Sequence, residues 1–127
     1  MITVKEIHNK EIWESFVLST KWTPFFQSWV FGESQQKSGT TIFRYGIFDD
    51  NDLKMVAQVT LVKAKRGTRF HIRHGPVFTN WENTYVLALF HELTSIAAHY
   101  GVTHILFSPL IDIENSNWVH LHPLTTV

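Results

Sequence analysis

The 127-residue chain contains no cysteine. Disulfide bonds, thiolate metal sites and a cysteine nucleophile are therefore excluded. It also lacks any apolar run approaching the roughly 20 residues that a membrane-spanning helix needs. Its first residues, from Met1 to Glu6, show no basic segment followed by an apolar one, so they do not form a signal peptide. These absences favour a cytoplasmic protein without a transmembrane segment.

Acidic residues are missing from the middle of the chain. Basic and acidic residues balance at 11 each, yet no Asp or Glu lies between Asp52 and Glu82. That segment holds six basic residues, namely Lys54, Lys63, Lys65, Arg66, Arg69 and Arg73. A local positive patch attracts phosphate even when the net charge is zero. A solvated hairpin tip accounts for the same residues, and the sequence alone leaves both interpretations open.

The common catalytic and phosphate-binding motifs are absent as well. Neither Gly-rich phosphate loop (G-x-x-x-x-G-K or G-x-G-x-x-G) occurs, nor does the G-x-S-x-G nucleophile elbow. His120 and His122 are spaced to share a face, but catalytic zinc usually takes three protein ligands, which favours an ordinary surface pair. We therefore predict no metal site and no cofactor, and the sequence identifies no catalytic residue.

Hydrophobic periodicity predicts one α/β domain covering residues 1–127. The expected elements, in chain order, are a strand at 2–7, a helix capped by Asn9, a helix capped by Ser28 and stopped at Gly39, strands at 41–48, 53–65 and 70–73, a helix at 83–100 and a strand at 102–107. Hairpin strands followed by a helix and a returning strand give a mixed sheet with helices packed on it. Residues 111–127 are expected to form an irregular tail, in which Asp112 or Asn115 could start a helix through Trp118.

Apolar side chains at helical spacing define the expected core faces. In the first helix this face consists of Ile12, Trp13, Phe16 and Val17. In the last helix it consists of Leu89, Leu93 and Ile96. Most aromatic residues fit core positions of this kind. Trp29 and Phe31 differ because they stand beside Gln27 and Gln35 in a polar context, so packing and ligand binding are both open for them.

Two segments carry distinctive patterns, FFQSWVFGESQ at residues 25–35 and HIRHGPV at residues 71–77. Both resemble segments of the FemABX family of peptidoglycan aminoacyltransferases. Residues 25–35 are similar to a segment near the start of these proteins. That segment commonly shows an aromatic residue or Leu, then Gln-Ser, then Trp, then a second aromatic residue and a Gly or Ala. Residues 71–77 are similar to a strand of the family. That strand ends in a basic residue, then any residue, then Gly-Pro-Val. Strands and a helix between and after these segments agree in character, so the resemblance covers nearly all of 7–110. It implies a GNAT-like mixed sheet flanked by helices.

The resemblance also implies a reaction, in which an amino acid passes from aminoacyl-tRNA to a peptidoglycan precursor held in a cleft between two GNAT-like domains. Both segments would lie near that cleft. The implied substrate-binding residues are Gln27, Trp29, Phe31, Gln35, Lys37, Arg73, Gly75 and Pro76. Some family members have a basic residue near the position of Glu33, so the resemblance gives the acidic Glu33 no phosphate-binding role, and Lys37, one helical turn further on, is the candidate substitute. The acetyl-CoA signature of ordinary GNAT enzymes is missing, which disfavours acetyl-CoA transfer.

Length separates this chain from a complete family member, which needs a second domain for its acceptor site and its chemistry. We therefore expect an incomplete first domain that is inactive alone. The alternative is a non-catalytic GNAT-like module that binds a ligand or partner, as a homodimer that replaces the missing half. For Arg73, contact with a phosphate or carboxylate and pairing with Glu33 are the two competing expectations.

Overall fold

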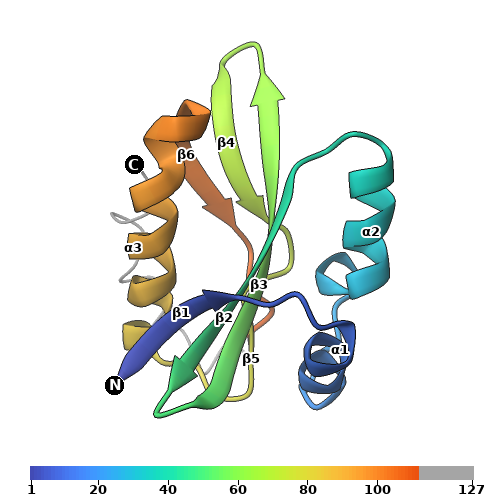
Figure 1. The fold of residues 1–127 in the computed structure, drawn as a ribbon, viewed down its shortest axis with the longest axis vertical. Helices are drawn as coiled ribbons and strands as arrows, with labels where there is room; N and C mark the ends of the chain where they lie inside the picture. Colours follow the sequence, from blue (N-terminus) through green and yellow to red (C-terminus); the bar gives the residue numbers. More distant parts are fainter. Residues whose placement is uncertain (112–127) are drawn as a thin grey trace.

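The computed structural model describes residues 1–111. In this part of the chain, a mixed sheet of six strands has helices on both faces (Figure 1). Its elements are β1 (Ile2–Glu6), α1 (Lys10–Leu18), the 3-10 turn η1 (Phe25–Gln27), α2 (Trp29–Lys37), β2 (Ile42–Asp49), β3 (Asp52–Ala64), β4 (Gly67–Ile72), β5 (Val77–Phe78), α3 (Asn83–Tyr100) and β6 (Val102–Phe107). The main strands and helices follow the predicted order. The expected helix through Trp118 and the pair His120 and His122 lie outside the described residues.

The strands are arranged in the order β1-β2-β3-β4-β6, and β5 pairs with β3. Neighbouring strands run antiparallel except β4 and β6, which are parallel and are connected through β5 and α3. The sequence did not predict η1 and β5. These elements are only three and two residues long, too short to produce a periodic pattern.

Helix α3 covers one face of the sheet and forms the larger core with it (Figure 1). Leu89 and Leu93 are completely buried there, as predicted. Ile96 is only partly buried, contrary to expectation, because it lines an open hollow between α3 and the β1–β2 edge. Since side chains alternate along a strand, every second residue of β2 and β3 points away from α3 toward the opposite layer.

Helices α1 and α2 make up that opposite layer, over β3 and β2 (Figure 1). Asn9 caps α1, because its Oδ1 accepts from the backbone N of Ile12 at 3.0 Å. Trp13 and Val17 are buried and Phe16 packs against them, but Ile12 is 50% exposed, so its predicted burial is wrong. The short helix directs the i, i+4 pair of Trp13 and Val17 at the sheet, which leaves Ile12 on its flank.

Candidate functional site

The edge of β3 that faces β4 and β5 contains a gap. β4 pairs with β3 as far as Thr60, and β5 pairs with it only at Met55 and Val56. The backbone of Gln58 therefore has no strand partner on that side, although Gln58 is only 2% exposed. Buried peptide groups nearly always find a hydrogen-bond partner, so another group must replace the strand here.

The side-chain amide of Gln27 fills this gap. Its Oε1 accepts from the backbone N of Gln58 at 2.7 Å. Its Nε2 donates to the backbone O of Gln58 at 3.1 Å and to the backbone O of Arg73 at 2.8 Å. Gln27 is completely buried. The amide thus takes the place of a peptide group, and it ties η1 both to β3 and to the loop after β4.

Gln58 and Arg44 extend the hydrogen-bond network toward α2. Gln58 Nε2 donates to the backbone O of Ser28 at 2.8 Å, and its Oε1 accepts from Arg44 Nε at 2.9 Å. Arg44 also donates to the backbone O of Trp29, and its guanidinium lies 3.8 Å from the centre of the Trp29 ring. Burial lowers the pKa of Arg44, and the charge of Glu33 opposes that shift. These contacts fix the start of α2 against β2 and β3.

Two glycines make room for the network. A Cβ on Gly32 would lie 2.1 Å from Oε1 of Gln58, and a Cβ on Gly75 would lie 2.6 Å from Cδ of Gln27. Non-bonded carbon atoms are normally about 3.5–4 Å apart, so neither site accepts a side chain without movement. The glycine in each of the two family-like segments is therefore needed because a buried amide approaches its backbone closely.

Beside the network, Arg73 presents its side chain to solvent. Its guanidinium lies 3.6 Å from the centre of the Phe26 ring, and Phe26 also packs edge-on against His74 at 5.1 Å. In the described part of the chain Arg73 forms no ion pair, so the expected pairing with Glu33 is not formed. Glu33 acts electrostatically on Arg44 instead. A guanidinium held on a ring with its donors unused can bind a phosphate or carboxylate through two parallel hydrogen bonds.

The two segments singled out by the sequence meet in space, as predicted, through the contacts of Gln27 and Phe26 with Arg73. The residues predicted to bind substrate differ in exposure: buried are Gln27, Gly75 and Pro76, half-buried are Trp29, Phe31 and Gln35, and exposed are Lys37 and Arg73. Phe31 packs on Phe26 at 5.1 Å and so supports the ring beneath Arg73. Lys37 stands at the far end of α2.

Sequence reasoning missed several partners in this site, namely Trp13, Phe26, Arg44 and Gln58. Trp13 is more than a core residue, because its Nε1 donates to the backbone O of Gln27 at 2.7 Å. One signal was available for two of the others. Arg44 and Gln58 interrupt the apolar runs 42–48 and 55–59 in the middle of their strands, and a polar side chain in such a place must find a buried partner.

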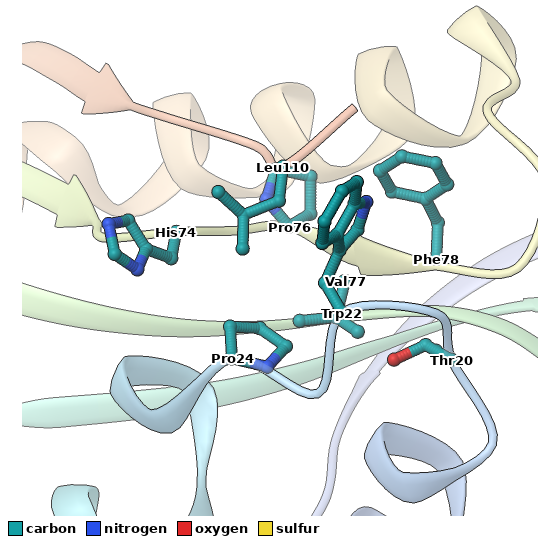
Figure 2. Close-up of a pocket in the computed structure, with 8 residues that line it drawn as sticks. All are labelled: Thr20, Trp22, Pro24, His74, Pro76, Val77, Phe78 and Leu110. Carbon is teal, nitrogen blue, oxygen red and sulfur yellow. The ribbon is translucent and has the colours of Figure 1, made fainter. Parts of the chain in front are cut away.

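A small cavity lies between the α1–η1 connection and the segment around β5 (Figure 2). Trp22 and Pro24 line it from the first side, and Pro76 and Phe78 line it from the second. Its volume is about 10 Å³, which is room for one water molecule, so it cannot hold an organic substrate. A larger hollow of about 370 Å³ lies beside Leu18 on α1.

The described residues contain no group of three or more His, Cys, Asp or Glu side chains that could hold a metal ion. Within the same part of the chain, no helix is long and apolar enough to cross a membrane. What these residues do assemble is a cation supported by an aromatic ring, on a loop that a buried amide holds in place. Such an arrangement suits an anionic ligand.

Solved structures define the class of fold. The crystal structure of FemX matches with a TM-score of 0.80 and 20% identity, covering 96% of this chain and 31% of the FemX chain. A transcriptional regulator from Bacillus halodurans C-125 matches with a TM-score of 0.66 and 13% identity, covering 97% and 90% of the two chains. A predicted acetyltransferase with acetyl-CoA from Clostridium acetobutylicum matches with a TM-score of 0.59 and 10% identity, covering 96% and 99%. The protein therefore has a GNAT-like fold, as the family resemblance implied.

The sequence itself identifies the family. The FemAB family matches residues 8–120, which is most of the chain. This protein therefore belongs to the FemAB family, and the resemblance found in its two segments is confirmed. It spans 31% of the FemX chain with which its structure was compared. A comparison with curated protein sequences finds no match.

Proposed function

We propose that this chain serves in the aminoacyl-tRNA-dependent transfer of an amino acid to a peptidoglycan precursor, as part or relative of a transferase of its family. The observation that carries the proposal is the loop after β4, where Gln27 fixes the backbone of Arg73 and Phe26 supports its guanidinium. An arginine held in this way is preorganised for an anionic group. Membership of the FemAB family suggests that this group belongs to the precursor.

In this proposal the buried and exposed members of the site have different roles. Buried Gln27, Gly75 and Pro76 position the loop, and Arg73 contacts a phosphate or carboxylate of a UDP-linked muramyl peptide. The residues that flank the ligand along α2 are Trp29, Phe31, Gln35 and Lys37. We expect weak binding and no aminoacyl transfer by this chain alone. A cytoplasmic location belongs to the proposal, because aminoacyl-tRNA and UDP-linked precursors are cytoplasmic.

Calorimetric titration of a UDP-linked muramyl pentapeptide against the wild type and Arg73→Gln tests the proposal. Hydrogen bonds to a charged group contribute about 1.5–3 kcal/mol, so Kd should rise roughly 10- to 150-fold in the variant. Arg66→Gln is the matched control, since it removes the same charge from the exposed hairpin tip and should leave Kd nearly unchanged. Absence of binding by the wild type, or equal binding by Arg73→Gln, would contradict the proposal.

A non-catalytic, single-domain binding module is the second candidate. One observation favours its single-domain size, because the chain covers 90% and 99% of two chains of similar fold, so this fold also occurs in chains of about this size. In that case we expect a homodimer. Sedimentation equilibrium at high micromolar concentration tests this, and a monomer would count against the dimer.

A further inference from the structure

A second cationic cluster lies on the half of the sheet that α1 and α2 leave open. α1 packs on β3 and α2 on β2, whereas β4 and β6 lie to the side of these helices (Figure 1). Arg69 of β4 pairs with His104 of β6, and His71 follows two residues further along β4. Residues at i and i+2 of a strand share a face. Phe70 and Ile105 alternate with these positions and are buried against α3, so the three basic side chains share the open face.

Among the described residues, no carboxylate pairs with these basic side chains. The sequence contains no acidic residue within 53–81, and in the described part of the chain Arg69 forms no ion pair. Among the described residues, Nε of Arg69 has no hydrogen-bond partner, and the atom is shut off from solvent. Burial and then the neighbouring cations, Arg69 first among them, lower the pKa of His71. An anion on this face would accept from the other guanidinium nitrogens of Arg69 and would offset the positive charge that acts on His71.

We propose that Arg69, His71 and His104 form a binding site for a phosphate or diphosphate group. A tetrahedral dianion suits this set, because the guanidinium binds two of its oxygens in parallel and the imidazoles can donate to the others. A carboxylate would offset only one charge of three basic groups. Leu106 pairs with His71 and is 46% exposed, so an organic phosphate finds an apolar surface beside the site. The charge of Arg73 also acts on His71, but its guanidinium is stacked on the Phe26 ring, so we do not include Arg73 in this site.

Titration of diphosphate into the full chain, at constant ionic strength and near the ordinary pKa of imidazole, tests the proposal. We expect saturable binding that Arg69→Gln weakens about tenfold or more. Lys65→Gln removes an exposed charge from the hairpin tip and should leave the binding nearly unchanged. The imidazole NMR signals of His71 and His104 should shift along the same saturation curve. His104→Gln is the second variant, expected to weaken binding severalfold even where Arg69→Gln fails to fold.

Imidazole NMR shifts that do not saturate, or equal weakening of diphosphate binding by Arg69→Gln and Lys65→Gln, would indicate general charge attraction. Either result would contradict a specific site. A parallel titration with UDP distinguishes the sources of the phosphate. Tighter binding of UDP than of diphosphate indicates a nucleotide whose nucleoside part adds affinity, and equal binding indicates recognition of the diphosphate group alone. Arg73 is intact in every variant of this experiment. A negative result here therefore contradicts the site at Arg69, His71 and His104 without contradicting precursor binding at Arg73.

Discussion

Replacing Gln27 by leucine tests whether a side-chain amide stands in for a missing strand. The substitution roughly preserves volume but removes the hydrogen bonds to the backbone N and O of Gln58 and to the O of Arg73. Both peptide groups of Gln58 then remain buried without a partner, since neither β4 nor β5 reaches them. Each such group costs about 1–3 kcal/mol, so the variant should lose about 2–6 kcal/mol of unfolding free energy. Arg73 is exposed, and we count no penalty for its carbonyl.

A loss of this size is large against the whole stability of a small domain, about 5–15 kcal/mol. Urea denaturation followed by tryptophan fluorescence measures it, because the chain has five tryptophans. Hydrogen exchange gives a local measurement. The amide of Gln58 donates to Gln27 in the wild type, so its protection should fall more in the variant than that of amides in the middle of α3.

Gln35→Leu is the matched control. It removes the same amide from a half-buried position on α2, and in the described part of the chain this side chain makes no hydrogen bond. Its cost should stay below about 1 kcal/mol. If Gln27→Leu also costs less than about 1 kcal/mol, or if the Gln58 amide keeps its protection, the amide does not replace a strand and our interpretation of the gap in β3 is wrong.

Two further predictions concern the face of the sheet that α3 covers. Leu93 is completely buried, so Leu93→Ala should cost about 2–5 kcal/mol in the same denaturation assay; an unchanged urea midpoint would contradict its place in the core. Burial, first among the causes, raises the pKa of Tyr45 to about 12. An unfolded tyrosine ionises near pH 10, so Tyr45 favours the folded state below about pH 10 and this contribution is lost as the pH rises toward 12. As the pH rises from about 10 to about 12, the unfolding free energy of Tyr45→Phe should therefore fall less than that of the wild type. Parallel curves of unfolding free energy against pH for the two proteins would refute the raised pKa of Tyr45.

The sequence predicted the long elements because their patterns repeat over many residues. β3 and α3 extend over 13 and 18 residues, enough for an alternating or helical pattern to be unmistakable. Prediction failed where a side chain meets a backbone far away in the chain. Gln27 and Gln58 are 31 residues apart, and a glutamine among aromatic residues suggested contact with a ligand. Only the missing strand partner of Gln58 explains why this amide is buried, and no local pattern encodes that gap.

The two segments that carry the family resemblance meet at the Gln27 amide. The glutamine of the first segment lies so close to Gly75 of the second that a Cβ there would be 2.6 Å from its Cδ. The pattern therefore marks a packing arrangement before it marks a ligand contact, and changes at these two positions should affect binding through the position of the loop. Arg73 is different, because within residues 1–111 its exposed side chain contributes only a stacking contact on Phe26 to the fold. A variant at Arg73 should thus keep the stability of the wild type and lose only affinity for the ligand. Variants at Gln27 or Gly75 change both stability and ligand binding, so they cannot separate these two effects.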